Sequence, residues 1–152
     1  MNAVIRRLDD DTPEPVRRQL DRILDESRAA LVGPDEHLAL VDERIGEAAG
    51  DPERGLYYAI KDGLALGLID AHYYRPDSGA FTVAHLAVNV GARGQGVGRA
   101  LVEVVAAAAQ DLGLLALYAA TRPGHPSADA FWEALGCTLD EEGPTRVYRR
   151  GD

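Results

Sequence analysis

The feature that most constrains the fold is a row of alternating glycines between two apolar segments. Gly94, Gly96 and Gly98 separate a strand-like segment at 81–90 from an alanine-rich segment at 97–112 with the character of a long helix. A strand, a tight glycine turn and a helix in this order are typical of an α/β domain. Glycines at a helix start also let a phosphate approach free backbone N–H groups at the positive end of the helix dipole. The loop therefore predicts an α/β fold class and an anion site.

The other apolar patterns predict strands and helices in one continuous series, without a linker or a repeat. Strands are expected at 4–8, 56–60, 64–73, 81–90, 114–121, 137–141 and 145–149, the last two as a closing hairpin that turns at 142–144. Helices are expected from Thr12 to Gly33, from Gly33-Pro34 to Gly50, at 97–112 and from Ser127 to Leu135, with Thr12 and Ser127 as side-chain caps. The charged residues at 42–47 are expected on a solvated helix face. One domain spanning residues 1–152 is therefore predicted.

Charge and composition narrow the function classes. The chain of 152 residues carries 16 basic and 25 acidic side chains, a net charge of −9. Such a field repels phosphate backbones, which argues against nucleic-acid binding, and it attracts cationic small molecules; a purely solubilising role is the alternative. One cysteine, Cys137, excludes an intrachain disulfide, and no run of about 18 apolar residues marks a membrane helix or a signal peptide. We expect a cytoplasmic protein with no membrane or nucleic-acid partner.

Three kinds of phosphate-binding loop can be compared with this glycine row. A P-loop needs a lysine after its last glycine, and the only lysine of the chain is Lys61. A dinucleotide-binding loop needs its third glycine one place later and an acidic residue at the end of the next strand, which reads Ala-Ala-Thr at 119–121. The third kind has glutamine or arginine, two residues, glycine, one residue, and then glycine or alanine. Arg93, Gly96 and Gly98 match it without a gap, although a turn that binds no ligand is also compatible with the glycines alone.

The third pattern resembles the loop of the GNAT superfamily of N-acetyltransferases. Leu86-Ala87-Val88 precedes it as in that superfamily, the segment 128–137 resembles its later short helix, and 145–148 resembles its closing strand. The resemblance implies a mixed central sheet that is flanked by helices and splayed between its fourth and fifth strands. It also implies acetyl-CoA as cosubstrate, no metal, and transfer of the acetyl group by direct attack of an amine in a ternary complex.

The same resemblance assigns cofactor binding to the strand, the loop and the later helix. The residues implied are Leu86, Ala87, Val88, Arg93, Gly94, Gln95, Gly96, Val97, Gly98, Arg99, His125 and Trp132. The backbone at 94–99 would hold the pyrophosphate, and the N–H of Val88 would stabilise the oxyanion. Trp132 stands where many members carry a tyrosine acid, and an indole N–H donates a hydrogen bond but releases no proton at useful pH.

The groups expected to act in catalysis are Val88, His85 and Tyr118. His85 has a suitable intrinsic pKa for a base or substrate contact, but its side chain faces away from Leu86 and Val88 unless a bulge intervenes, and a structural role is the alternative. Tyr118 and Tyr148 are candidate acids. Departure of the thiolate without an acid is also compatible with the sequence, since the pKa of a thiol is about 8.5.

The acceptor is expected to be a small cationic molecule with a primary amine. The segments expected to select it, 30–43 and 72–81, carry five carboxylates: Asp35, Glu36, Asp42, Glu43 and Asp77. A basic peptide or protein amine is the closest rival. Outside this enzyme class, the alternatives are a non-catalytic CoA-binding or regulatory module and a dinucleotide-binding protein. Assembly into a homodimer is left open.

Overall fold

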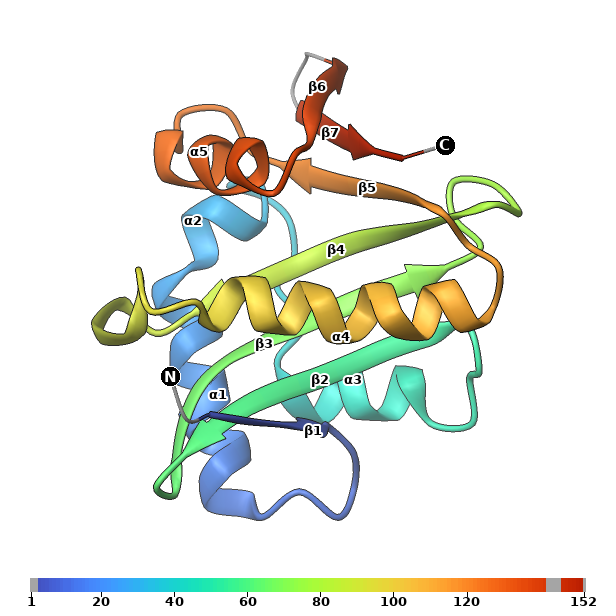
Figure 1. Ribbon diagram of the computed structural model, residues 1–152. Coiled ribbons are helices and arrows are strands. Elements are labelled where there is room, and N and C mark those ends of the chain that lie inside the picture. Colours follow the sequence, from blue (N-terminus) through green and yellow to red (C-terminus); the bar gives the residue numbers. More distant parts are fainter. Residues whose placement is uncertain (1–2, 142–145, 152) are drawn as a thin grey trace.

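A seven-stranded mixed sheet forms the centre of the computed structural model, which describes residues 3–141 and 146–151 (Figure 1). The strands are β1 (Val4–Arg7), β2 (Arg54–Lys61), β3 (Leu64–Tyr73), β4 (Ala80–Val88), β5 (Ala116–Thr121), β6 (Thr138–Glu141) and β7 (Arg146–Arg150). Their spatial order is β1-β2-β3-β4-β5-β7-β6, with β4 and β5 parallel and the other neighbours antiparallel. A helical crossover joins the parallel pair, as such pairs require. The mixed sheet confirms the expected fold class.

Helices cover both faces of this sheet. They are α1 (Glu14–Glu26), α2 (Arg28–Leu31), α3 (Val41–Ala48), α4 (Val97–Asp111) and α5 (Pro126–Ala134), with a 3-10 turn, η1 (Val90–Ala92), before the glycine loop. α1 and α3 pack on one face, while α4 lies across the other (Figure 1). Each face has its own apolar core: Leu20, Leu24 and Ile45 belong to the core under α1 and α3, and Leu101 and Val105 belong to the core under α4. The amphipathic stripes of the sequence are therefore the buried helix faces.

The first helix differs from its prediction at both ends. Pro13 rather than Thr12 is the N-cap residue, and the Thr12 hydroxyl instead accepts a hydrogen bond from the N–H of Asp9 at 3.1 Å. The helix also ends before Ser27 and does not run on to Gly33. α2 is a separate turn, and this break brings α2 against β4, where it lines the cavity described below.

Two later boundaries also differ from the prediction. α5 begins at Pro126 with His125 as its N-cap residue, so Ser127 does not cap it. α3 begins only at Val41. β6 and β7 pair antiparallel, which confirms the closing hairpin, while its expected turn at 142–144 lies outside the described residues.

A β-bulge in β4 decides which way its side chains face. Asp70 pairs with His85 and Ala71 pairs with Val83, so Ala84 is an extra residue without a partner on β3. Residues two apart on a regular strand share a face, and the extra residue breaks that rule here. Val83 consequently packs in the core under α4, while the side chain of His85 faces the α3 side of the sheet.

β4 and β5 separate after their first few paired residues. Residues 80–83 pair with 116–119, and the described chain places no strand beside the rest of β4 on that edge (Figure 1). This confirms the splay expected between the fourth and fifth strands. The open edge leaves backbone groups of β4 available to a ligand.

Candidate active site

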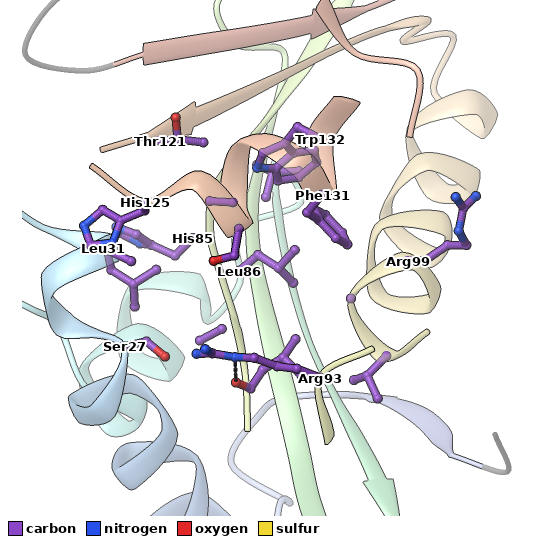
Figure 2. Close-up of a pocket in the computed structure, with 18 of the residues that line it drawn as sticks. Ser27, Leu31, His85, Leu86, Arg93, Arg99, Thr121, His125, Phe131 and Trp132 are labelled. Atoms are coloured by element: carbon purple, nitrogen blue, oxygen red, sulfur yellow. Dashed lines mark hydrogen bonds between the residues drawn. The ribbon is translucent and has the colours of Figure 1, made fainter. Parts of the chain in front are cut away.

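A cavity of about 740 Å³ occupies the region where β4 and β5 diverge. Its floor is the later half of β4. The loop before α4 and the first turn of α4 form one end, and α5 with its preceding loop forms a side (Figure 2). The end of α1 and the single turn of α2 form the remaining wall. The cavity therefore brings α2 to the glycine loop and the adjoining β4, although α2 lies far from both in the sequence.

The glycine loop presents unpaired backbone N–H groups at the cavity. Gly94 and Gly96 have φ angles of 78° and 84°, a left-handed conformation that glycine adopts without strain, and nothing lies within 4 Å of a Cβ built on either. Gly96 is the N-cap residue of α4, and it offers no side chain to cap the helix. The N–H groups of Val97, Gly98 and Arg99 have no helical partner, because in the first turn of any helix no helical carbonyl lies one turn earlier to accept them. A pyrophosphate would satisfy them at the positive end of the helix dipole.

Gly98 has an additional and different reason to be glycine. A Cβ at this position would lie 2.9 Å from Cε1 and 3.1 Å from Cζ of Phe131. The backbone of α4 thus packs directly against this ring of α5. Phe131 in turn meets Trp132 edge to face, with ring centroids 4.9 Å apart. The third glycine of the loop therefore serves the packing of α5 on α4, which the loop pattern alone did not predict.

The backbone of β4 directs Val88 toward its open edge. The N–H of Asn89 donates to the carbonyl of Leu66 in β3 at 2.8 Å. Successive N–H groups of a strand point to opposite edges, so the N–H of Val88 points away from β3. The carbonyl of Val88 accepts a hydrogen bond from Nε of Arg93 at 3.4 Å (Figure 2). This end of β4 therefore offers a backbone donor next to the glycine loop.

His85 lies in the cavity wall, but both of its ring nitrogens are engaged. Nδ1 lies 2.9 Å from Nη1 of Arg44, and because a guanidinium can only donate, Nδ1 accepts. The other ring nitrogen donates to the backbone carbonyl of Leu31 in α2. Burial, followed by the positive charge of Arg44, lowers the pKa of His85 to about 4. The imidazole is therefore neutral near pH 7 and holds no free lone pair for a substrate proton.

Behind His85 lies a buried ion-pair cluster that the sequence reasoning missed. Arg44, expected on a solvated helix face, is only 1% exposed, and its Nη1 donates to Oδ2 of Asp70 at 2.7 Å. Arg54 donates to both oxygens of the same carboxylate, at 2.6 and 2.8 Å. Burial acts to raise the pKa of Asp70, but the hydrogen bonds and charges of the two arginines lower it overall. The one available signal was a lone carboxylate within the apolar run 64–73.

Most of the residues expected to bind the cofactor meet in one lining. Leu86, Ala87, Val88, Arg93, Gly94, Gly96, Val97, Gly98, Arg99, His125 and Trp132 all line the cavity. Gln95 does not, because its side-chain amide turns back to donate to the Gly91 carbonyl at 3.3 Å. Tyr118 also lies outside, where its hydroxyl accepts a hydrogen bond from Nε of Arg149 at 2.8 Å. Tyr148 is buried outside the lining, so the structure brings neither tyrosine to the cavity.

The acceptor side of the cavity differs from the expectation. Of the five carboxylates expected there, none is among the described residues that line the cavity. Three form ion pairs: Glu36 with Arg122, which itself lines the cavity, Asp42 with Arg17 and Arg18, and Glu43 with His37. The residues of the α1–α2 wall that the sequence reasoning missed are Glu26, Ser27 and Ala29, whereas Ala30 and Leu31 fall within the expected segment 30–43. Within the described lining, Glu26 is the one carboxylate, and α2 contributes mainly apolar surface.

Neither a metal-binding cluster nor a membrane-spanning helix is found in the part of the chain that the structure describes. Among residues 3–141 and 146–151, no three His, Cys, Asp or Glu side chains are grouped so that they could hold a metal ion. Over the same part of the chain, no helix has both the length and the apolar surface needed to cross a bilayer. The polar groups that the cavity offers are backbone N–H groups, guanidinium groups, imidazoles, hydroxyls and one carboxylate.

Comparison with known proteins gives this arrangement a family. The model of the acetyltransferase (GNAT) family matches residues 14–137. The structure is similar to an acetyltransferase from Thermus thermophilus, with a TM-score of 0.81 and 20% identity over 100% of this chain and 98% of that chain. It is also similar to the GNAT domain of S. lividans PAT (TM-score 0.80, 20% identity, 99% of this chain and 90% of that chain). The PaiA N-acetyltransferase of Thermoplasma acidophilum, in complex with coenzyme A, has a TM-score of 0.77 and 11% identity over 100% of both chains. No curated protein matches the chain.

Because the family match covers most of the chain, the protein belongs to the acetyltransferase (GNAT) family. It is an enzyme, an acyltransferase that uses acetyl-CoA as its cosubstrate. The dinucleotide-binding alternative is thereby excluded.

Proposed function

We propose that this acetyltransferase moves the acetyl group to the primary amine of a small cationic molecule, by direct attack in a ternary complex. The observation that carries the proposal is the continuous cavity from the start of α4, along the open edge of β4, to the α1–α2 wall. A cavity of this form can receive a cofactor from one end and an amine from the other. Cys137, the one thiol of the chain, is buried outside the lining, which agrees with transfer that uses no acyl-cysteine.

Coenzyme A fits the residues at the α4 end. The free N–H groups of the first helical turn suit a pyrophosphate, and the space beside Gly94 and Gly96 admits one. The guanidinium groups of Arg93 and Arg99 line the same end and add charge-assisted donors. The amide groups of the pantetheine arm would pair with the unpaired backbone groups of β4, in the way that an extended peptide adds to a sheet edge. His125 and Trp132 would flank this arm from the α5 side.

The reaction needs a stabilised oxyanion and a leaving thiolate. The nitrogen of the neutral amine bonds to the thioester carbonyl carbon, the C–S bond breaks and the thiolate of CoA departs, while the proton that the new amide nitrogen loses passes to water. The N–H of Val88 would donate to the oxyanion as charge develops on it. Trp132 can donate a hydrogen bond but not a proton, and a thiol pKa of about 8.5 makes departure without an acid tolerable.

The acceptor must lose a proton before it can attack. Among the described side chains of the cavity, His85 was the expected base, and both of its nitrogens already have partners. We therefore assign proton removal to water that connects the cavity with solvent. Tyr118 has no part in this scheme because it lies outside the lining.

The preference for a cationic acceptor rests on charge. The chain carries a net charge of −9, and Glu26 places a carboxylate in the described lining beside the acceptor wall. The field would raise the local concentration of amines through long-range steering. A basic peptide is the nearest rival, and the assay below separates the two.

Release of free CoA thiol tests the proposal directly. Polyamines, aminoglycosides, amino acids and short basic peptides would be offered, each at 0.01 M and 0.1 M salt, over which the screening length falls from about 30 Å to about 10 Å. We expect turnover with small cationic amines, and a fall in kcat/KM as salt increases. Turnover confined to peptides, or to neutral or acidic amines, contradicts the acceptor proposal.

A pair of glycine variants tests the cofactor site by calorimetry. Gly96→Val should abolish CoA binding because its side chain enters the phosphate cradle. Gly50→Val is the matched control: Gly50 also has a positive φ, 71°, with open space around a Cβ, but it lies outside the cavity lining. Both variants carry the same backbone strain, so equal loss of CoA binding would contradict the assignment of the loop.

A further inference from the structure

We propose that a buried polar chain, running from Arg54 through Asp70 and Arg44 to His85, positions α2 as a wall of the acceptor site. His85 is then a positioning residue. The effect of His85 on acceptor binding rests on the proposed function, whereas its hydrogen bond to α2 is independent of that function. The chain crosses the molecule from β2 to the cavity. Figure 2 shows Ser27 and Leu31 on the α1–α2 side of this cavity, the side that His85 contacts from β4.

Every link in this chain has a matched donor and acceptor. Asp70 accepts from Arg54 at 2.6 and 2.8 Å and from Arg44 at 2.7 Å. Arg44 donates from the same Nη1 to Nδ1 of His85 at 2.9 Å, and the ring N–H of His85 donates to the carbonyl of Leu31. Only a neutral imidazole with its proton on Nε2 can satisfy both partners. This buried polar chain therefore selects one tautomer of His85 and one position for α2.

α2 itself buries little surface, although the residues on either side of it, Ser27 and Val32, are buried. It has four residues, of which none is buried, and a single turn is not stable alone. Leu31 packs only partly against the apolar core. Arg44 strengthens the same wall from the other side, since its Nε donates to the carbonyl of Ala39 at 2.7 Å and so holds the segment that follows α2. Ala30 and Leu31, which the chain holds in place, both line the cavity.

The surroundings of His85 also oppose its use as a base. A proton on Nδ1 would place a second positive charge 2.9 Å from Nη1 of Arg44. His72 adds potential positive charge nearby, and Asp70 is the anion that already pairs with both Arg44 and Arg54. The ring is thus held neutral by the same contacts that let it bridge to α2.

Two substitutions of His85 separate positioning from proton transfer. In His85→Gln, the amide oxygen can accept from Arg44 and the amide nitrogen can donate to Leu31, but the side chain cannot act as a base. His85→Leu removes both hydrogen bonds. The control is His37→Leu, because His37 is exposed and lies outside the cavity lining. The readouts are kcat and KM for the amine, the affinity for CoA, the pH profile of kcat/KM, and hydrogen exchange at the amides of Ala30 and Val32.

For His85→Leu we expect a rise of about tenfold in the amine KM, the loss expected from one or two buried hydrogen bonds, with unchanged CoA affinity. Exchange at Ala30 and Val32, whose N–H groups donate to Ser27 and Arg28, should accelerate. His85→Gln and the control should resemble the wild type in KM, exchange and pH profile. Loss of activity in His85→Gln together with loss of the acidic limb of the pH profile would overturn the proposal in favour of a base. Unchanged exchange and KM in His85→Leu would overturn it as well. If the wild type acetylates no amine, the proposed function fails while the exchange measurement still decides whether the chain holds α2.

Discussion

Replacing Gly98 by alanine tests whether the third glycine of the loop serves packing or phosphate approach. Within a helix, alanine is favoured over glycine by about 1 kcal/mol. Against this gain, the new Cβ would lie 2.9 Å from Cε1 of Phe131, which is too close for carbon atoms, so the ring or α5 must shift. Overpacking of this kind costs about 1–3 kcal/mol. We therefore expect Gly98→Ala to lower the free energy of unfolding by about 1 kcal/mol.

A double-mutant cycle with Phe131→Ala isolates this contact. With the ring removed, Gly98→Ala should raise the free energy of unfolding by about 1 kcal/mol, because only the helix preference remains. Urea unfolding can be followed by the fluorescence of Trp132, the only tryptophan of the chain, which lies beside the ring. An equal effect of Gly98→Ala in both backgrounds would refute the packing argument. A loss of CoA affinity on Gly98→Ala in the Phe131→Ala background would show that the glycine instead serves the phosphate.

Three further outcomes follow from the buried cluster and the helices. Asp70→Asn should cost about 3–5 kcal/mol in thermal unfolding, since it removes the anion of the buried Arg44 and leaves the half-buried Arg54 with its longer ion pair to Glu47 at 3.7 Å, whereas Asp111→Asn on the surface should stay within about 0.5 kcal/mol. Because burial lowers the pKa of His85 to about 4 from 6.5, the unfolded state binds more protons between these values, and the free energy of unfolding should fall by up to about 3 kcal/mol as the pH drops through them. Urea titrations at pH 7 and at about pH 4.5 should show a smaller drop for His85→Gln, and an equal drop in both proteins would contradict this account. Gly46→Ala in α3, where nothing lies within 4 Å of the new Cβ, should stabilise the protein by up to about 1 kcal/mol in the same assay.

The lining of the cavity at the glycine loop could be predicted from the sequence because its determinants are local. A phosphate cradle at a helix start needs backbone N–H groups and glycines within a few consecutive residues, and Arg93, Gly96 and Gly98 all lie within the segment 93–98. The splayed sheet was expected from the resemblance that these residues carry, and the pairing of β4 with β5 confirms it. The alanine-rich composition of 97–112 likewise predicted the long helix, which spans Val97–Asp111.

Helix boundaries show where local preference stops being sufficient. Thr12 and Ser127 are good capping residues, yet neither caps its helix, because the Thr12 hydroxyl closes the preceding turn and His125 already precedes α5. Capping energies are about 1 kcal/mol, so packing of the whole helix outweighs them easily. Arg44 departs from its prediction for a similar reason. Its charged neighbours on the helix indicate a solvated face, but α3 turns this side chain toward the carboxylate of Asp70, 26 residues away.

The acceptor end depends on contacts that no local pattern encodes. Asp70 and Arg44 are each ordinary charged residues in the sequence, and only the pairing of β3 with β4 and the packing of α3 bring them together behind His85. The extra residue at Ala84 breaks the alternation between Val83 and His85, so these two side chains lie on opposite faces of the sheet, whereas His85 keeps the expected direction away from Leu86 and Val88. Burial then removes the proton from this histidine and engages both nitrogens. The residue type alone suggested that His85 is a base. In the folded state, its low-dielectric surroundings and fixed partners give His85 a bridging role. The physical reason is that the protonation and direction of a side chain are properties of its tertiary environment.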